Sequence, residues 1–366
     1  MQKNTPRLEH LVSLRGIAAW WVVFFHSLAL MMSAYPTIPK KLVTTISYGY
    51  LAVDFFFVLS GFIIFINYHD KFSLSFRRNI LPFYWNRLTR IYPVHLIMLL
   101  AYLMLAGVFL YASTSHALPL QFAQRQFFEN LFLVQAWQIE STSWNVPAWS
   151  VSAEWFVYLL FPFIAASLAR FAHGLLAKVL LAVAVFIVVI AFGTLLSEGE
   201  AKHVLMLPLV RATHEFLLGA IVGALFIHHK NWLINAKPFF MLLIVGVAIM
   251  YYLVGVPHYF FVPFCCFCSL CIFSVDESWL TRLLNMKYLV YLGEISYSTY
   301  MIHYFVKDIF KASFVSDLRS VNPYGLVASF LFVLLASMVM YRYFEMPAQG
   351  FLRKRFFVNR KKSVAA

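Results

Sequence analysis

Long apolar runs recur along the chain, and short polar breaks separate them. A run of about 20 apolar residues can cross a bilayer as an α-helix, which satisfies its backbone hydrogen bonds internally. The pattern therefore predicts an all-α polytopic membrane protein with about ten transmembrane helices. We place the spans at 11–32, 46–67, 93–112, 149–169, 176–196, 204–227, 238–254, 258–274, 288–310 and 324–344.

One further apolar stretch, residues 127–137, is too short to cross the membrane. It precedes a polar segment, 138–148, that is rich in Ser and Trp. We expect residues 127–137 to form a re-entrant or interfacial segment. An eleventh span here would move Lys230, Lys237 and the basic C-terminal residues outside, against the tendency of Lys and Arg to remain cytoplasmic.

The charge distribution predicts the orientation of the chain. There are 29 Lys and Arg residues against 15 Asp and Glu, which gives a net charge of +14. With about ten spans and a cytoplasmic N-terminus, most basic residues fall in cytoplasmic segments, so both termini are expected in the cytoplasm. We expect one transmembrane domain over 1–350 and a basic cytoplasmic tail over 351–366, whose interleaved aromatic residues suit an interface with anionic lipid. Because the cytoplasmic segments account for the charge, no nucleic-acid partner is expected.

The composition narrows the class of protein. Hydrophobic residues make up 62% of the chain and charged residues 12%, whereas soluble proteins are roughly 45–50% apolar and about 25% charged. This excludes a cytosolic enzyme, a secreted disulfide scaffold and a disordered protein. Four cysteines share the span 258–274 at a spacing that no common metal site uses. We expect them to pack as small hydrophobic residues, and we expect no metal.

An ionisable side chain inside a membrane is costly unless it is paired or faces water, so such residues are candidates for function. Arg15 and His26 lie in one apolar run, and their separation of 11 residues places them on one helical face about 16 Å apart. With Arg15 at the cytoplasmic surface, His26 lies near the bilayer centre. A neutral imidazole there is suited to act as general base or nucleophile. The alternative is a core histidine bonded to a backbone carbonyl.

Asp54 lies in the second apolar run and needs a partner from another helix, either His26 or an arginine. A carboxylate beside His26 would orient the imidazole, and the alternative is a structural ion pair. In the sixth span, Arg211 and Glu215 are four residues apart, which predicts an intrahelical pair. Gly61 is expected to permit close packing of helices.

Polar and aromatic side chains gather where the fourth span begins. Aromatic rings with hydroxyl and amide groups suit the binding of a sugar or another polyol, although tryptophans in this position also suit the membrane interface. The residues of this group are Trp144, Asn145, Trp149, Ser152 and, inside the span, Glu154. On the ninth span, a polar stripe that ends at His303 is expected to face the interior of the bundle.

The basic run 76–93 contains four arginines. Arg87 and Arg90 share a helical face, and Arg77 and Arg78 lie close upstream. On the cytoplasmic side these guanidinium groups are suited to bind a polyphosphate. The alternatives are ordinary cytoplasmic charge and the binding of lipid headgroups.

Taken together, these segments resemble the motifs of the acyltransferase-3 family of integral membrane acyltransferases, over nearly the whole chain. The similar segments occur in the family's order and are Leu14–His26, Ala52–Phe62, Trp85–Pro93, Pro147–Pro162, Leu292–His303 and Glu345–Pro347. One position departs from the family's pattern, because Trp155 stands where a second acidic residue often follows. Glu154 therefore has any carboxylate role alone.

The resemblance implies transfer of an acyl group, commonly acetyl from acetyl-CoA, to a hydroxyl of a cell-envelope glycan such as a lipopolysaccharide or exopolysaccharide sugar, or, as in some members of the family, of a small hydroxyl-bearing molecule. We expect the transfer to cross the membrane. The resemblance also places the protein in the lipid bilayer of a bacterial inner membrane. We then expect the acyl donor at Arg15, Arg77, Arg78, Arg87 and Arg90, and the acceptor at Trp144, Asn145, Trp149, Ser152 and His303. The expected catalytic residues are His26, as base or nucleophile, Asp54, which would orient it, and Glu154.

The alternative function is a secondary transporter that couples transport to protonation of His26, Asp54 or Glu154. A transporter explains the buried charges but not an arginine cluster suited to a nucleotide. If coenzyme A protects Arg90 against chemical modification, this would favour the enzyme. Proton-coupled uptake into vesicles would favour the transporter.

Overall fold

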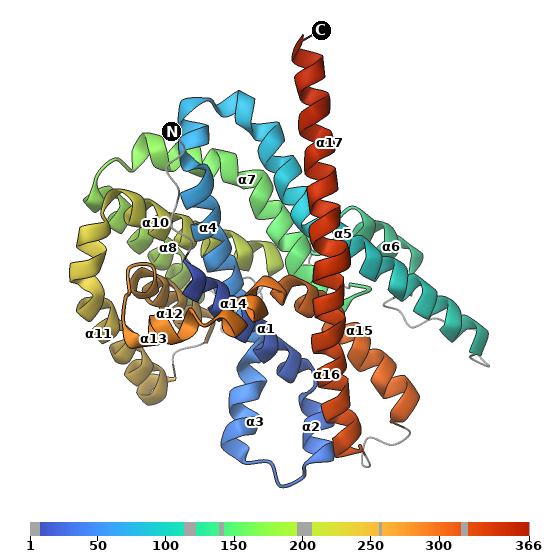
Figure 1. Cartoon of the computed structure of the whole chain (residues 1–366). Coiled ribbons are helices and arrows are strands. Elements are labelled where there is room, and N and C mark those ends of the chain that lie inside the picture. Colours follow the sequence, from blue (N-terminus) through green and yellow to red (C-terminus); the bar gives the residue numbers. More distant parts are fainter. Residues whose placement is uncertain are drawn as a thin grey trace. The chain divides into compact units, whose positions relative to one another are not determined.

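The computed structural model describes residues 8–112, 122–138, 143–195, 207–255, 258–315 and 321–365. Across these ranges the chain is helical and has no strand, as its apolar runs predict (Figure 1). The helices are α1 (Glu9–His26), α2 (Leu28–Ala34), α3 (Lys40–Ser47), α4 (Ala52–Leu74), α5 (Phe76–Ala112), α6 (Gln124–Leu131), α7 (Trp149–Phe171), α8 (Leu175–Leu195), α10 (Pro208–His228), α11 (Lys230–Val254), α12 (His258–Phe273), α13 (Trp279–Leu284), α14 (Lys287–Glu294), α15 (Ser296–Phe314), α16 (Pro323–Met340) and α17 (Met346–Ala365). Several basic residues that contributed to the charge prediction lie outside the described residues, namely Lys3, Arg7, Lys202, Arg319 and those whose side chains follow residue 356.

Six helical stretches in the described part of the chain are long and apolar enough to span a bilayer. They are Lys40–Leu74, Phe76–Tyr111, Val146–Phe171, Pro208–His228, Lys230–Val254 and Pro323–Phe356. α1 and α2 meet at a bend of 63° and together form a seventh candidate, while Leu175–Ala191 and Tyr259–Phe273 are shorter apolar helices. The protein is therefore a multi-pass helical membrane protein. The count of about ten spans stays a prediction.

The helices form two compact units. The first contains Met1–Arg15, Val53–Leu81 and Phe156–Val290, and the second contains Gly16–Ala52, Pro82–Trp155 and Tyr291–Ala366. Each unit is built from segments that are distant in the sequence. Contacts between helices, rather than proximity along the chain, therefore hold each unit together.

In the first unit, α4 and α10 pack closely through two glycines. A Cβ atom at Gly61 of α4 would collide with the carbonyl oxygen of Phe216, and one at Gly219 of α10 would collide with that of Val58. The missing side chains let the two backbones touch, which confirms the packing role predicted for Gly61. The four cysteines of α12, in the same unit, are free thiols, and Cys268 and Cys271 among them are buried.

Three sets of helices run parallel, and each is defined by two contacts at different heights. The contacts are Asp54 with Arg211 and Phe65 with Gly223 for α4 and α10, Gly16 with Gly293 and His26 with His303 for α1 against α14 and α15, and Ile91 with Tyr297 and Tyr102 with Asp308 for α5 and α15. Two helices that cross a membrane in the same direction must have an odd number of other crossings between them along the chain. In the predicted numbering, α4 and α10 are the second and sixth spans, and α1, α5 and α15 are the first, third and ninth. Each set meets the condition.

The apolar segment 127–137 forms the end of α6 and the turn that follows it. α6 has eight residues, which is too short to cross a bilayer, in agreement with the prediction for this segment. The hydroxyl of Ser152 on α7 donates to the carbonyl of Leu133 at 2.7 Å and accepts from the backbone N–H of Ala136 at 3.1 Å. Ser152 therefore holds the turn against α7.

α16 continues into α17 through one π-helical turn, η5 (Tyr341–Glu345). Such turns are rare and occur frequently at functional sites. The turn ends at Glu345, which is only 1% exposed. α17 then contains the beginning of the predicted basic tail.

Candidate active site

His26 is the last residue of α1 and lies at the bend between α1 and α2. Its Nδ1 is 2.9 Å from Nε2 of His303 on α15. The two ring planes are inclined by only 25° and their centroids are 5.1 Å apart, which fits a hydrogen bond that joins the rings edge to edge. Arg15 lies earlier on the same helix and is half-buried.

The backbone of α15 determines which ring nitrogens hold the protons. Nδ1 of His303 is 3.2 Å from the carbonyl oxygen of Thr299, one turn earlier. A carbonyl only accepts, so in the neutral pair Nδ1 of His303 is protonated and its Nε2 is an acceptor. Nδ1 of His26 must then donate, which leaves a lone pair on Nε2 of His26. His26 thus has the tautomer that a general base or nucleophile needs, and His303 fixes it.

An aromatic ring and a cation lie beside the histidine pair. The ring of Tyr304 contacts His26 edge to face, with centroids 5.1 Å apart. Nζ of Lys307 is 3.2 Å from the centroid of the Tyr304 ring. Lys307 is one turn after His303, so the two residues share a face of α15. A cation in this position is suited to stabilise negative charge that develops on an acyl carbonyl oxygen.

The segment predicted to bind the acceptor is attached to α15 next to His303. Nδ2 of Asn145 donates to the carbonyl of Met301 at 2.8 Å. The hydroxyl of Tyr300 donates to the carbonyl of Pro147 at 3.0 Å and lies 2.7 Å from the hydroxyl of Ser150. Oδ1 of Asn145 is buried and has no hydrogen-bond partner among the described residues, so it is available to a ligand.

Other residues of this segment have different surroundings from those predicted. Trp144 is 3% exposed and packs against Phe122, so it belongs to an aromatic cluster. Ser152 binds the turn after α6, which is a structural role. Trp149 and Glu154 are half-buried near the start of α7, and their contact with an acceptor stays a prediction.

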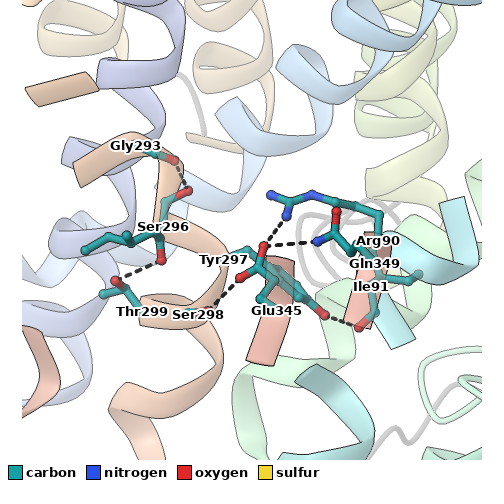
Figure 2. Close-up of polar contacts among 10 residues, drawn as sticks. Arg90, Ile91, Gly293, Ser296, Tyr297, Ser298, Thr299, Glu345 and Gln349 are labelled. Carbon is teal, nitrogen blue, oxygen red and sulfur yellow. Dashed lines mark hydrogen bonds and ion pairs between the residues drawn. The ribbon is translucent and has the colours of Figure 1, made fainter. Parts of the chain in front are cut away.

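Arg90, predicted to bind the donor, belongs to an internal ion pair. Its Nη1 donates to Oε1 of Glu345. The same carboxylate accepts from the hydroxyl of Ser298 at 2.6 Å and from Nε2 of Gln349 at 3.3 Å, as Figure 2 shows. A buried carboxylate with three donors joins α5, α15 and α17 strongly. The motif at Glu345 was visible in the sequence, but its partner was not.

The other arginines of the basic run differ in exposure. Arg77 and Arg78 are exposed on the first turn of α5 and belong to the first unit. Arg87 is half-buried and belongs to the second. In that second unit α17 adds another guanidinium group, because Nε of Arg353 lies 3.5 Å from Oγ1 of Thr89 on α5.

The beginning of the predicted tail packs on α5. Nε1 of Trp85 donates to the carbonyl of Leu352 at 3.1 Å, and the rings of Trp85 and Phe356 stack at 5.1 Å. α17 therefore packs along the half of α5 that contains the arginines. Arg87 and Arg353 belong to these two packed helices, and guanidinium groups are suited to bind an anionic ligand such as a phosphate.

Asp54 has a different partner from the one assigned to it in the expected mechanism. Its two carboxylate oxygens accept from Nε and Nη2 of Arg211 at 2.7 and 2.6 Å. Both side chains are 5% exposed, so this is a buried bidentate ion pair. Glu215 lies 3.8 Å from Arg211, as predicted. Asp54 therefore forms the ion pair that was its alternative, and the side chain that hydrogen-bonds to His26 is His303.

Three residues of α15 near His26 were not predicted from the sequence, namely Tyr304, Lys307 and Asp308. Tyr304 and Lys307 contact the histidine pair or follow it by one turn, and Asp308 accepts from the hydroxyl of Tyr102 at 3.2 Å. Their spacing was a usable signal, because Lys307 follows His303 by four residues and Asp308 follows Tyr304 by four, so each pair shares a face of the helix.

The family model described as an acyltransferase domain, that of the acyltransferase-3 family, matches residues 11–342. The chain is 27% identical over 328 residues to the acyltransferase MdmB of Streptomyces mycarofaciens, and this match covers 84% of the chain and 80% of MdmB. It is 25% identical over 392 residues to the O-acetyltransferase OatA of Staphylococcus aureus, and this match covers 98% of the chain but only 60% of OatA. No solved structure matches the chain.

These similarities decide between the enzyme and the transporter. Both relatives are acyltransferases by name, and the family match covers nearly all of the described helices. The prediction of an O-acyltransferase enzyme is confirmed, and the chain belongs to the acyltransferase-3 family.

Proposed function

We propose that this protein transfers acetyl from acetyl-CoA to a hydroxyl group of a cell-envelope glycan, such as a lipopolysaccharide or exopolysaccharide sugar, in the bacterial inner membrane. The main support is the hydrogen bond between His26 and His303, which leaves Nε2 of His26 as a base within a bundle of apolar helices. One of the relatives is an O-acetyltransferase by name, which supports acetyl as the acyl group.

The proposed topology has about ten spans and both termini in the cytoplasm. The three parallel sets of helices support it, because each set has the relative direction that this numbering requires. We retain a single transmembrane domain over 1–350 and a cytoplasmic tail over 351–366. In this topology α15 begins at the cytoplasmic side and ends at the outer side.

The donor and the acceptor then approach His26 from opposite sides. The Arg90–Glu345 pair is at Ser298 near the cytoplasmic start of α15, His303 follows five residues later, and Asp308 follows after five more. Each interval is about 7.5 Å at 1.5 Å per residue.

Basic residues on the cytoplasmic side bind the nucleotide of the donor. Arg87 and Arg353, both in the second unit, contact its phosphates. Arg15, Arg77 and Arg78, which the sequence also predicts to bind the donor, belong to the first unit. Arg90 acts indirectly in this proposal, because it is bound to Glu345. Bound acetyl-CoA supplies a thioester carbonyl as the electrophile.

His26 moves the proton. Its Nε2 removes the proton from the acceptor hydroxyl while the hydroxyl oxygen bonds to the acyl carbon and the carbon–sulfur bond breaks. The proton then passes from Nε2 to the leaving thiolate. Alternatively, Nε2 attacks the acyl carbon first and the thiolate leaves; the hydroxyl then displaces the acyl group from Nε2, and its proton passes to the thiolate. Both routes use the same nitrogen, and in both Lys307 stabilises the oxyanion.

Mass spectrometry of envelope glycans from cells with and without this protein tests the proposal. Each transferred acetyl group adds about 42 mass units, and we expect this increment only in cells that contain the protein. Identical glycan masses in both cell types would contradict the proposed function.

A further inference from the structure

We propose that a pocket beside Tyr304 binds one sugar ring of the acceptor, a neutral pyranose with several free hydroxyls. This inference rests on the proposed function and names the acceptor site for it. The pocket has a volume of about 220 Å³ and lies in the second unit. Its walls include Leu105 and Phe109 of α5, Phe122, and Tyr304, Asp308 and Lys311 of α15.

The position of the pocket relates it to the reaction. Tyr304 is both a wall of the pocket and the ring that contacts His26 at 5.1 Å. Asp308 and Lys311 follow Tyr304 by four and seven residues, so all three share one face of α15. This face is next to the one that contains His303 and Lys307. A ring held in the pocket is therefore one side chain away from the proposed base.

The chemistry of the walls matches a sugar ring. Phe109, Phe122 and Tyr304 are aromatic and suit the apolar C–H face of a pyranose, while the carboxylate of Asp308 accepts hydrogen bonds from hydroxyl groups. Lys311 can donate to ring or hydroxyl oxygens. Pockets for drug-sized ligands are roughly 300–1,000 Å³, so this smaller volume suits a single ring.

The walls are held in place by a second layer of contacts. The hydroxyl of Tyr102 donates to Oδ2 of Asp308 at 3.2 Å, and Nζ of Lys307 lies 3.4 Å from Oδ1. Phe122 packs against Trp144 with centroids 5.3 Å apart. Trp144, which the sequence predicts to bind the acceptor, thus supports the ring of Phe122 in the wall of the pocket. A preformed site loses less freedom on binding.

Other occupants fit the pocket less well. A hydrocarbon chain would place apolar atoms against the carboxylate of Asp308 and the ammonium of Lys311, which costs free energy without a compensating hydrogen bond. A nucleotide is too large, and its phosphates would meet the carboxylate. A neutral ring with hydroxyls satisfies both the aromatic and the charged walls.

Photolabelling tests the site without relying on transfer. The purified full-length protein in lipid nanodiscs is irradiated with methyl pyranosides that contain a diazirine, in the gluco, galacto and manno forms. We expect label on peptides that contain 105–109 or 304–312, and at least fivefold less label with excess unlabelled methyl pyranosides. Label confined to other segments, or label at the pocket from a photoreactive fatty acid alone, would overturn the proposal.

Two variants and one control make the result specific. We expect Asp308→Asn and Phe109→Ala each to lower pocket labelling at least fivefold. Asp70→Asn removes a carboxylate that is 77% exposed in the first unit, and we expect it to label as the wild type does. Phe109 is 36% exposed, so its truncation tests the site even if the Asp308 variant fails to fold. Unchanged labelling in folded Phe109→Ala and Asp308→Asn would overturn the proposal.

The outcomes separate this inference from the proposed function. Glycan acetylation that depends on the protein, without labelling of the pocket, would reject the acceptor site and keep the function. Labelling of the pocket in a protein whose loss leaves glycan masses unchanged would keep the sugar site and reject the function.

Discussion

Nδ1 of His26 lies 2.9 Å from Nε2 of His303, and Nδ1 of His303 in turn binds the carbonyl oxygen of Thr299. These two hydrogen bonds connect the backbone of α15 to an imidazole at the bend after α1. A base oriented by a second group is the arrangement that nucleophilic catalysis commonly uses. Here the second group is another imidazole, so the pair is neutral and suits an apolar environment.

Replacing His303 tests whether it orients His26. We expect His303→Ala to lower kcat by about 10²–10⁴-fold, because the base loses its fixed tautomer. His303→Gln should recover part of the rate, since its amide oxygen can accept from Nδ1 of His26. The measurement is kcat and its pH dependence for purified, folded variants. Equal losses in the Ala and Gln variants would reject the orienting role.

The Arg90–Glu345 pair predicts coupled effects on stability. Glu345→Gln leaves the Arg90 guanidinium without its charged partner; because Arg90 is 24% exposed, we expect this to cost less than the roughly 3–5 kcal/mol of a fully buried pair. We expect the double variant Arg90→Gln/Glu345→Gln to be more stable than the sum of the single effects, with a coupling of about 1–3 kcal/mol. Unfolding of the four proteins in detergent measures this. If the stability losses of the two single variants simply add in the double variant, Arg90 would instead bind the donor directly.

Close packing of α4 on α10 predicts a sharp difference between two glycines. Gly219→Ala would place a methyl group against the carbonyl oxygen of Val58, and we expect a loss of about 1–3 kcal/mol. Gly246→Ala, on α11, has nothing within 4 Å of the new Cβ. We expect that control to unfold at or above the wild-type temperature. A wild-type melting temperature for Gly219→Ala would contradict the close contact.

Replacing Asp54 tests whether this residue has a structural or a catalytic role. Because both of its carboxylate oxygens bind Arg211, we expect Asp54→Asn to lower the folded yield in membranes by several fold. The kcat of the protein that does fold should change less than tenfold. A kcat as low as that of a His26 variant, at wild-type yield, would show that Asp54 takes part in the reaction.

Asp276, between α12 and α13, predicts a pH dependence of stability. Burial raises the pKa of Asp276, but hydrogen bonds from Ser278 and Thr281 and from the ammonium of Lys237 outweigh it and hold the pKa well below its ordinary value. Oδ2 accepts from the two hydroxyls at 2.5 and 2.6 Å, and Oδ1 lies 3.2 Å from Nζ of Lys237. The folded protein thus favours the ionised form.

The sign of the effect follows from that difference. A carboxyl group whose pKa is lower in the folded state stabilises the folded protein fully at pH values above its unfolded pKa of about 3.9. This stabilisation is lost as the pH falls toward the pKa of the folded state. We expect Asp276→Asn to melt at a lower temperature at pH 7 and to lose less stability than the wild type below about pH 4. Parallel melting curves across this range would contradict the assignment.

The sequence was sufficient for those features that depend on local pattern. Apolar runs predict helices because a bilayer leaves few other ways to satisfy the backbone, and the packing role of Gly61 and the short segment at 127–137 follow from similar arguments. Pairs of residues on different helices could not be predicted in this way. Glu345 is 255 residues from Arg90, and Arg211 is 157 from Asp54. Tertiary packing determines such partners, and residue spacing along the chain does not predict them.

Trp144 and His303 show the same limit within the site. Each was expected to contact the acceptor because aromatic and polar residues gather near it in the sequence. The structure buries Trp144 behind Phe122 and places His303 against His26. Which face of a side chain is covered depends on neighbours that are distant in the chain, so residue type alone could not assign either role.

Acetyl transfer by purified His26→Ala tests the central claim most directly. Wild type, His26→Ala and the control His173→Ala, which replaces an exposed histidine, are reconstituted in nanodiscs with radiolabelled acetyl-CoA and envelope glycan from cells that lack the protein. We predict that label reaches the glycan with the wild type and His173→Ala, and that folded His26→Ala transfers none above background. Transfer by folded His26→Ala at the wild-type rate would contradict the account.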